Sequence, residues 1–161
     1  MKMTPAKHRK YSKALQNNKL LKSLQEDQID SILEQVEEEI WPKHTCLVDR
    51  TKTLHRFYFL ITGRIKVYKV DPMTGREFTL FLLTKNDAFD ILCLLDEQEH
   101  EVFYETLDKV VMLSISMSAI RRWVREIPEI NRNMLPYLGH QLKIMEEYAS
   151  NVTLIDISTR L

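Results

Sequence analysis

Residues 57–83 have the sequence FYFLITGRIKVYKVDPMTGREFTLFLL, in which runs of β-branched and aromatic residues alternate with turn residues. The runs predict β-strands at residues 57–61, 64–70 and 77–83. The segment DPMTG supplies the proline and the glycine of a hairpin turn, and Thr62-Gly63 forms a second tight connection. These residues therefore predict consecutive short strands joined by tight turns.

The strand pattern extends from about Trp41 to Ser116, and a last strand is predicted at residues 110–116. Many short strands without long helices between them are typical of a barrel or roll and not of a parallel βαβ sheet. The predicted fold class is mainly β with flanking helices. In detail, we expect a double-stranded β-helix, or jelly-roll-like β-roll, followed by a long C-terminal helix.

Helices are predicted on both sides of the strands. Ser23-Leu24-Gln25-Glu26 has the form of a capping box, so the first helix is expected to begin at Ser23. Its apolar residues at helical spacing are Ile29, Ile32, Leu33, Val36 and Ile40. A second helix is expected over residues 119–125, with Ser116 or Ser118 as its N-cap, and Pro128 suits the first turn of a third helix.

The third helix carries a heptad pattern. Spacings of 3, 4, 3, 4 and 3 residues separate its apolar residues, which are Leu135, Leu138, Leu142, Met145, Ala149 and Val152. This pattern favours pairing with the same helix of a second copy, although a helix lying on its own domain would look similar. Pro136 and Gly139 are expected to bend the helix near its start.

The chain has 161 residues, 23 basic and 23 acidic side chains and 44% apolar residues, which describes one ordinary globular domain. Its zero formal net charge argues against a dedicated nucleic-acid surface. The charges are unevenly placed, since residues 1–22 carry seven Lys or Arg and no acid, whereas residues 26–39 carry seven acids and no base. A solvated helical face explains the basic run better than an arm that binds nucleic acid.

The cysteine content and the hydropathy indicate where the protein resides. Cys46 and Cys93 have no regular spacing, which suits a reducing compartment better than a disulfide framework. No apolar run reaches the roughly 18 residues of a membrane span, and residues 1–10 lack the apolar stretch of a signal peptide. We therefore expect a cytoplasmic location and no membrane partner.

The order of an acidic helix, a β-roll, a short helix and a long heptad helix resembles the sensor half of a family of bacterial transcription factors. This is the cyclic AMP receptor protein and fumarate-nitrate regulator (Crp/Fnr) family. Residues 57–67 resemble its strand pair around a glycine, and residues 71–80 resemble its hairpin. Residues 86–89 (NDAF) stand where a Gly-Asp-x-Phe turn is usual, and residues 154–161 resemble the hinge that leads to a DNA-reading domain.

The resemblance implies three parts: a basic N-terminal segment (1–22), a cyclic-nucleotide-binding-like β-roll with flanking helices (23–126), and a dimerisation helix with hinge (127–161). The family's C-terminal helix-turn-helix is missing from this sequence. The implied partners are a second copy of the chain, DNA only through the missing helix-turn-helix, and RNA polymerase. We expect a truncated regulator, because a hinge serves little purpose without something to hinge.

Relatives that bind cyclic nucleotides hold the phosphate with a Gly-Glu pair that opens a helical turn and an Arg-Ser pair about ten residues later. A helix N-terminus and a guanidinium then grip the anion. In this sequence the first pair aligns with Asp90 and Ile91, and the second pair with Glu101 and Val102. All four residues depart from the family pattern, so we do not expect cyclic AMP to bind in the usual way.

The other effector-pocket candidates follow from the same alignment. Met145 and Glu146 occupy the positions that would touch the purine, where small hydroxyl residues are usual. A cavity is expected among the apolar residues Phe89, Ile91, Leu92, Leu94, Val102 and Tyr104. Either these side chains fill the space themselves or they leave room for a less anionic effector, and the sequence favours neither.

Other site chemistry has little support. The sequence has no GxSxG, P-loop or HExxH motif, so we expect no enzyme activity. His44 and Cys46 alternate on one predicted strand, but with Cys93 they give no signal specific to a metal or a haem, and no metal site is predicted. A basic cluster near the second helix is explained as a solvated face with one anchoring tryptophan; it consists of Arg121, Arg122, Trp123, Arg125 and Arg132.

The leading interpretation is an effector-sensing and dimerisation module of a Crp/Fnr-type transcription regulator, with a degenerate phosphate-binding cassette and an unidentified effector. The alternative is a stand-alone sensor domain that binds a small ligand or haem and has no DNA-binding role.

Overall fold

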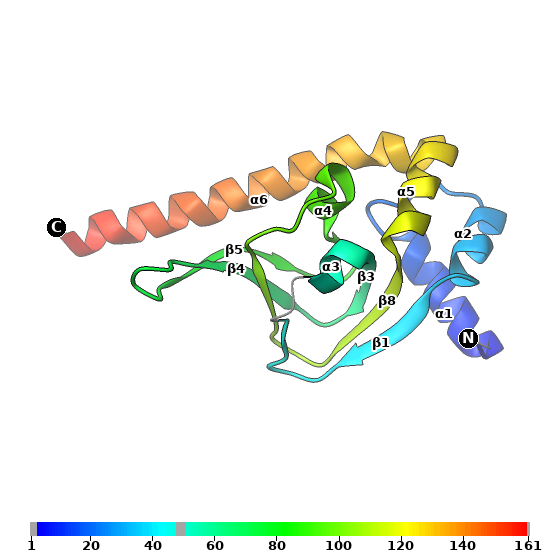
Figure 1. The fold of residues 1–161 in the computed structure, drawn as a ribbon, viewed down its shortest axis with the longest axis horizontal. Helices are drawn as coiled ribbons and strands as arrows, with labels where there is room; N and C mark the ends of the chain where they lie inside the picture. Colours follow the sequence, from blue (N-terminus) through cyan, green and yellow to red (C-terminus); the bar gives the residue numbers. More distant parts are fainter. Residues whose placement is uncertain (1–2, 48–50, 161) are drawn as a thin grey trace.

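The computed structural model describes residues 3–47 and 51–160, with side chains described as far as Asn151 except at Thr51. A β-roll forms the middle of the molecule (Figure 1). Three helices gather at one end of it: α1 (Pro5–Gln16), α2 (Glu26–Leu33) and α5 (Met117–Glu126). The long helix α6 (Pro128–Arg160) runs along the roll and beyond it.

Within the described residues the strands form two four-stranded antiparallel sheets, which confirms the predicted β-roll. The first sheet has the order β1-β8-β3-β6, with bounds Glu37–Trp41, Val110–Ser116, Arg56–Thr62 and Ala88–Phe89. The second has the order β2-β7-β4-β5, with bounds Cys46–Leu47, Phe103–Thr106, Ile65–Val70 and Glu77–Leu83. The strands predicted at residues 77–83 and 110–116 are confirmed without change, and those at 57–61 and 64–70 within one residue at each end.

The unbroken hydrophobic run FYFLI is explained by the position of β3, which is buried on both faces. Phe57 and Phe59 belong to the core beneath the helices at the end of the roll. Tyr58 and Leu60 belong to a second core inside the roll. Because neighbouring side chains of a strand point to opposite faces, a strand between two cores needs apolar residues at every position.

The first predicted helix was wrong in its start and its extent. Helix α2 begins after Gln25, whose N–H donates to Gln28 Oε1 at 2.8 Å, whereas Ser23 has a φ of 73° and ends the preceding turn. Ile40, assigned by its spacing to the same helix, lies in β1 opposite Val111 of β8. Tertiary strand pairing has overridden the local helical periodicity at this position.

The two short helices α3 (Thr51–His55) and α4 (Ile91–Asp96) were not predicted, whereas the caps of the later helices were. Ser116 Oγ accepts a hydrogen bond from Ala119 N–H at 3.2 Å and caps α5. Pro128 is the first residue of α6. Both outcomes follow from local chemistry, because a cap and a helix-starting proline act within one turn.

The described part of the basic N-terminal segment, residues 3–22, supplies the helix α1, which packs on the domain. Tyr11 and Leu15 of α1 are buried in the helical core, and the Tyr11 hydroxyl donates to Glu38. Lys7 forms an ion pair with the same carboxylate at 3.0 Å. The basic face of α1 therefore lies against the acidic strand β1, which explains how opposite charge runs coexist in neighbouring segments.

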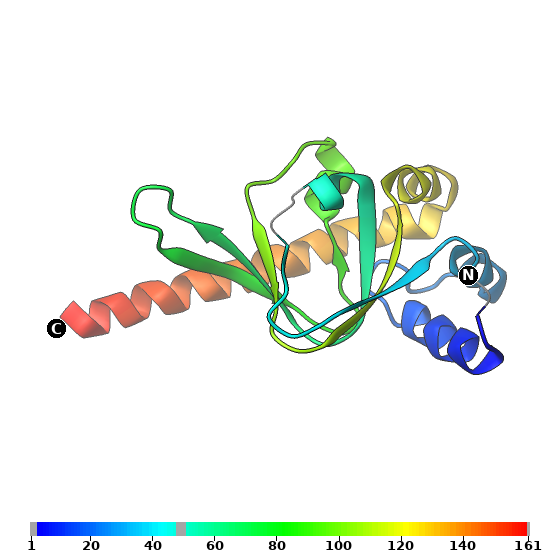
Figure 2. The same ribbon diagram turned by 60° about the horizontal axis from the view of Figure 1, so that its bottom comes forward.

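The first half of α6 is anchored to the body of the domain and its second half extends away from it (Figure 2). Ile130, Met134 and Tyr137 are buried in the helical core. Asn133 Nδ2 donates to the carbonyl oxygens of Leu20 and Lys22 at 3.0 and 2.6 Å. The helix then passes over β5, so apolar residues of α6 lie beside this strand of the roll.

Candidate effector cavity

A cavity of about 110 Å³ lies between the interior of the roll and α6. Its walls come from β4, β5, β6, β7, α4 and α6, so it is bounded by the roll on one side and by the long helix on the other. The lining residues are Val67, Leu80, Phe81, Ala88, Phe89, Asp90, Ile91, Leu92, His100, Val102, Tyr104, Leu138, Gln141, Leu142 and Met145. The lining is apolar except at a few positions.

Aromatic stacking holds the floor of the cavity. The Phe89 ring stacks on the Tyr58 ring, with ring centroids 4.9 Å apart. The centroid of the Tyr104 ring lies 5.2 Å from that of Phe89. All three rings are buried in the core of the roll. Aromatic pairs at such distances contribute roughly 0.5–1.5 kcal/mol beyond their burial, so the stacking stabilises this wall of the cavity.

Asp90 is the acidic residue of the cavity. Its Oδ1 accepts a hydrogen bond from Cys93 N–H at 3.3 Å and caps the short helix α4. Its Oδ2 is buried and has no hydrogen-bond partner among the residues that the structure describes. Burial and the neighbouring Asp90 raise the pKa of the Tyr104 phenol well above its usual value. Burial, with Asp90 and Asp96 nearby, raises the pKa of the Cys93 thiol to about 11.

His100 and Gln141 are the other polar residues of the lining. His100 Nε2 is buried without a hydrogen bond in the described part of the chain, and it lies 3.6 Å from Asp96 Oδ1. Gln141 Nε2 donates to the Tyr137 hydroxyl at 3.0 Å and is thereby satisfied. Among the described residues that line the cavity, Asp90 Oδ2 and His100 Nε2 are thus the buried side-chain atoms without a hydrogen bond.

The structure brings most of the predicted effector-pocket residues together. Seven of them line the cavity: Phe89, Asp90, Ile91, Leu92, Val102, Tyr104 and Met145. Glu101 and Glu146 are exposed and lie outside the lining. Leu94, also expected in the cavity, is buried in the helical core instead.

Several lining residues were missed by the sequence analysis. Val67, Leu80, Phe81 and His100 are the clearest cases. The register between β4 and β5 shifts between Val67 and Tyr68, which are paired with Phe81 and Thr79, so Leu80 is an extra residue opposite this step. Two consecutive residues of one strand then line the same cavity, which strict alternation does not allow.

Some of the predicted seam residues on α6 line the cavity, whereas others are exposed to solvent. Leu138, Leu142 and Met145 line the cavity of their own chain, and Leu142 is still 61% exposed. Leu135 is 77% exposed and Ala149 is also exposed. The side chain of Val152 lies outside the described residues. One helix face thus touches the roll and leaves large apolar side chains open to solvent.

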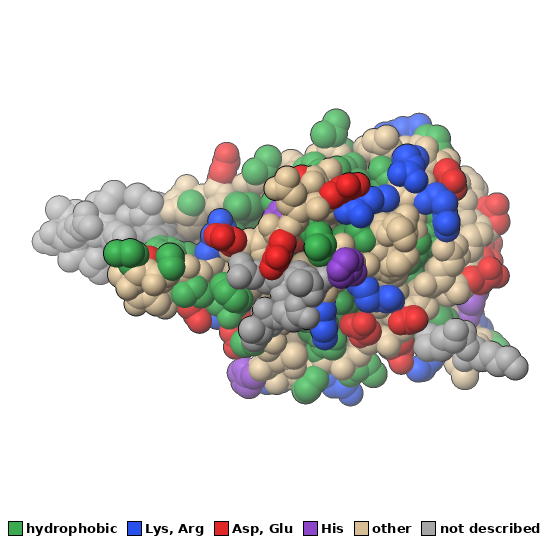
Figure 3. Space-filling view, viewed as in Figure 1, with side chains coloured by type: hydrophobic (Ala, Val, Ile, Leu, Met, Phe, Trp, Pro, Cys, Tyr) green, Lys and Arg blue, Asp and Glu red, His purple; other side chains and the backbone are tan. Residues whose placement is uncertain are grey.

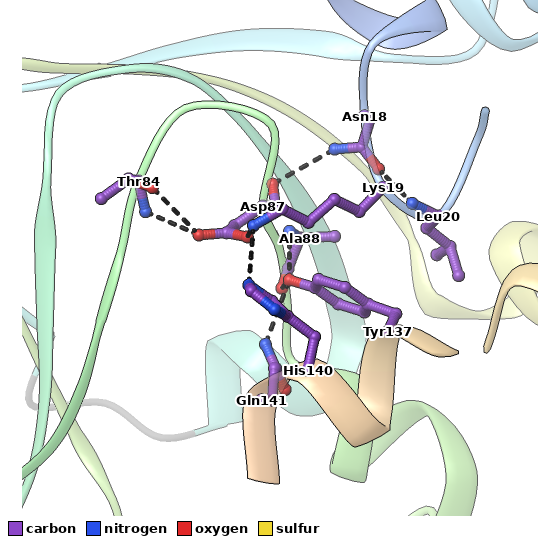
Figure 4. A network of polar contacts seen from close by, with 9 residues as sticks. All are labelled: Asn18, Lys19, Leu20, Thr84, Asp87, Ala88, Tyr137, His140 and Gln141. Carbon is purple, nitrogen blue, oxygen red and sulfur yellow. Dashed lines mark hydrogen bonds and ion pairs between the residues drawn. The ribbon is translucent and has the colours of Figure 1, made fainter. Parts of the chain in front are cut away.

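A polar network ties α6 to the turn beside the cavity (Figure 4). Lys19 Nζ forms an ion pair with the buried carboxylate of Asp87 at 2.7 Å and lies 3.2 Å from His140 Nε2. Asp87 also accepts hydrogen bonds from the N–H and the hydroxyl of Thr84. Three separate segments therefore meet at Asp87, and two residues later the chain enters the cavity wall at Phe89.

Part of the predicted basic cluster makes contacts within the domain, and Arg132 of that cluster lies on α6 rather than on α5. Lys and Arg side chains gather over α5 with acidic side chains close by (Figure 3). Arg121 donates to the carbonyl oxygens of Cys93 and Leu94 and lies 3.5 Å from a carboxylate oxygen of Glu97. Trp123 is buried beneath the same helix.

Metal and membrane sites receive no support from the described residues. Among them no group of three or more His, Cys, Asp or Glu side chains lies close enough together to hold a metal ion. In the same part of the chain no helix combines the length and the apolar character needed to cross a bilayer.

The β-roll, its flanking helices and the long helix after it form the fold of a cyclic nucleotide-binding domain. The chain matches the cyclic nucleotide-binding domain family over residues 38–126, and it belongs to that family. The family expectation from the sequence is thereby confirmed. The match ends at the last residue of α5, so it covers the roll and leaves α6 outside.

The curated relatives of the chain are transcription regulators. A global nitrogen regulator of Synechocystis sp. is 27% identical over an alignment of 149 residues, which covers 86% of this chain and 66% of the relative. A CRP-like cAMP-activated global transcriptional regulator of Mycobacterium tuberculosis is 26% identical over 106 residues, 66% of this chain and 47% of the relative. The chain thus spans about half to two thirds of these relatives, and the matched proteins are Crp/Fnr-type regulators rather than enzymes.

Solved structures confirm the fold. The sensor domain of the transcriptional regulator DNR from Pseudomonas aeruginosa superposes with a TM-score of 0.70 at 20% identity, covering 84% of this chain and 90% of that one. The catabolite activator protein of Thermus thermophilus gives a TM-score of 0.67 at 19% identity, covering 86% of this chain and 63% of that one. At these identities the similarity establishes the fold alone.

Proposed function

We propose that this chain is the effector-sensing and dimerisation module of a Crp/Fnr-type transcription regulator acting in the cytoplasm. The observation that carries the proposal is the composition of the cavity wall. Leu138, Leu142 and Met145 of α6 face the same space as Phe89 and Tyr104 of the roll. Any molecule that enters the cavity therefore touches the long helix directly, and its binding energy can favour one position of that helix over another.

Binding of cyclic AMP in the usual pose is not part of the proposed function. Asp90 and Ile91 stand at the Gly-Glu positions, and no Lys or Arg is found among the described residues that line the cavity. Two like charges about 4 Å apart repel by roughly 4 kcal/mol at an effective dielectric constant of 20. A phosphate beside Asp90 would meet this repulsion without a guanidinium to offset it.

The cavity volume also argues against a large effector. At about 110 Å³ it lies below the roughly 300–1,000 Å³ of common ligand sites. A cyclic nucleotide or a haem would have to displace α6 or the walls of the roll in order to enter. A small effector fits the cavity as it stands, and we favour it over the haem-binding alternative.

The proposed output is a change in the geometry of a homodimer. The exposed side chains of Leu135 and Leu142 leave an apolar stripe on α6 that a second copy can cover. In regulators that read DNA as dimers, two half-sites about 34 Å apart must be matched by two reading domains. A shift of α6 would change that spacing, and contacts to DNA and to RNA polymerase would come through a DNA-reading domain joined to the chain.

Sedimentation velocity of this chain tests the dimer. We expect a dimer at micromolar concentration and a monomer for Leu135→Asp, which places a charge on the stripe without touching the cavity lining. Lys143→Asp is the matched control, because Lys143 is exposed on the same helix outside the heptad seam. A chain that remains monomeric at several hundred micromolar would refute the proposed dimerisation.

Thermal unfolding with added cyclic AMP tests the cassette. We expect no shift of the midpoint at millimolar cyclic AMP, since a ligand that does not bind the folded state cannot stabilise it. A midpoint that rises with cyclic AMP concentration would show that the departures at Asp90, Ile91, Glu101 and Val102 do not abolish nucleotide binding.

A further inference from the structure

The cavity leaves one carboxylate oxygen without a partner. Asp90 is only 6% exposed, and no described residue donates a hydrogen bond of good geometry to its Oδ2, although the Tyr104 phenol lies close enough to the carboxylate for Asp90 to raise the tyrosine's pKa. Removing a polar atom from water without a replacement hydrogen bond costs free energy, and buried polar groups are therefore nearly always satisfied. A guest molecule in the cavity can supply the missing donor.

The position of Asp90 is held by the rest of its side chain. Its Oδ1 caps α4 through Cys93 N–H, so turning the carboxylate away would leave the start of that helix uncapped. His100, whose side chain is 15% exposed, lines the same cavity, and its Nε2 lies 3.6 Å from Asp96 Oδ1. The Asp90 carboxylate can only accept hydrogen bonds, so its open oxygen requires a donor from the guest.

The remaining walls select an apolar body of limited size. Val67, Phe81 and Val102 of the roll face Leu138 and Met145 of α6 across the cavity. A cavity of about 150 Å³ with apolar walls holds one benzene molecule, so a space of about 110 Å³ limits the apolar body to one six-membered ring or an aliphatic chain no larger than that ring. A second ring has no room.

We propose that the cavity binds a compact apolar molecule whose single head group is a hydrogen-bond donor, either an ammonium or a hydroxyl, and that it rejects carboxylates and phosphates. The proposal rests on the proposed sensing function and deepens it by naming the class of effector. Asp90 receives the head group, and the aromatic and aliphatic walls receive the body. This site would prefer a cationic or neutral donor group, whereas a phosphate-binding site prefers an anion.

Four probes that share one ring test the proposal. Benzylamine, benzyl alcohol, toluene and benzoate are titrated separately into the isotope-labelled chain, and binding is followed by the NMR shifts of residues that line the cavity. We expect the amine, the alcohol or both to bind at least ten-fold more tightly than benzoate and more tightly than toluene. The amine and alcohol titrations distinguish a cationic from a neutral effector.

Two variants assign the selectivity to Asp90. Asp90→Asn keeps an N-cap side chain and removes the charge, and we expect the preference for benzylamine over benzoate to fall at least ten-fold. Glu101→Gln removes an exposed carboxylate close in sequence but outside the lining, and we expect the preference to stay unchanged. If Asp90→Asn fails to fold, the ranking of the four probes on the unaltered chain decides the question.

The outcomes separate this inference from the function on which it rests. Equal binding of all four probes, or benzoate binding as tightly as the amine and the alcohol, overturns the head-group selectivity and leaves a cavity that senses small molecules. An Asp90→Asn variant with unaltered selectivity also overturns it. If no probe shifts the cavity residues at millimolar concentration, the cavity is not a small-molecule site, and the sensing function fails together with the inference.

Discussion

Tyr137 and Ala88 are joined by two hydrogen bonds. The N–H of Ala88 donates to the Tyr137 hydroxyl at 2.8 Å, and the hydroxyl donates back to the Ala88 carbonyl oxygen at 2.9 Å (Figure 4). One phenol thus serves as donor and acceptor for the backbone of the strand that leads into the cavity. Burial raises the pKa of Tyr137 far above its usual value, so the hydroxyl keeps its proton at every pH at which the chain is studied.

We expect Tyr137→Phe to lower the free energy of unfolding by about 1–3 kcal/mol. The substitution leaves the buried N–H of Ala88 without an acceptor, and an unsatisfied buried group carries its full desolvation cost. Urea unfolding followed by circular dichroism measures the change. Tyr148→Phe is the control, because Tyr148 lies partly exposed on the same helix. Equal stability of the two variants would mean that the backbone bonds at Ala88 contribute nothing net.

The ion pair between Lys19 and Asp87 leads to a second prediction. Lys19→Met removes the cation beside a carboxylate that is almost fully buried, and Thr84 then remains as its hydrogen-bond donor. Because Lys19 is itself more than one-third exposed, we expect a loss of about 1–2 kcal/mol, less than for a fully buried pair. Thermal unfolding compares it with Lys22→Met, which removes an exposed cation three residues away. If Lys22→Met lowers the stability by the same amount, the effect of Lys19→Met comes from general changes in the loop after α1 and not from the lost ion pair with Asp87.

The two cysteines should differ in reactivity. Cys46 is exposed, whereas Cys93 is buried with its pKa raised to about 11 by burial and by Asp90 and Asp96. At pH 8 about one Cys93 thiol in a thousand is then a thiolate, which is the reactive form. We expect one fast thiol with a disulfide reagent in the folded chain and a second only after denaturation. Cys46→Ser should remove the fast phase, and a fast phase that persists in it would refute the assignment.

The same shift has a consequence for stability. The folded chain binds the Cys93 proton more tightly than the unfolded chain does, because burial disfavours the thiolate. The stability contribution of this thiol is therefore complete below about pH 9 and is lost as the pH rises toward 11. Comparing the unfolding free energy of the unaltered chain and of Cys93→Ser across this window isolates the effect. Parallel curves would show that the thiol does not titrate with folding.

Replacing Gly63 and Gly139 by alanine is expected to change the free energy of unfolding in opposite directions. Gly63 has a φ of 93°, and a methyl group there would lie 2.7 Å from the Lys109 carbonyl oxygen. We expect Gly63→Ala to lower the free energy of unfolding by about 2 kcal/mol or more. Gly139 lies inside α6 with open space around it, so Gly139→Ala should add about 0.5–1 kcal/mol. Unfolding curves of the two variants that shift in the same direction would contradict this account.

The strands that were predicted well are those whose signals are local. The run EFTLFLL is bounded by turn residues on the hairpin side, and β5 has the predicted bounds. Ser116 capped α5 as expected, because its partner Ala119 is three residues away. Ile40 shows where local reasoning fails, since its helical spacing was outweighed by pairing with a strand some 70 residues further along the chain.

The cavity was predicted only in part for a related reason. Alignment with the family located Phe89, Asp90 and Tyr104, but it did not indicate His100, which comes from the connection after α4. Leu80 was missed because the irregular register between β4 and β5 breaks the alternation that a strand normally shows. A side chain that reaches the cavity through such a step has no signature in the sequence.

The amino-acid sequence by itself determined the β-roll fold class, the strands β3, β4, β5 and β8, and the starts of α5 and α6. These depend on residue type and on spacings of a few residues, which are set along the chain. Only the tertiary structure decided that Leu138, Leu142 and Met145 line a cavity, and that Asp90 lies there with one oxygen unpartnered. The heptad pattern alone was equally consistent with a partner helix or with the chain's own domain, because periodicity records that a face is apolar and not what covers it.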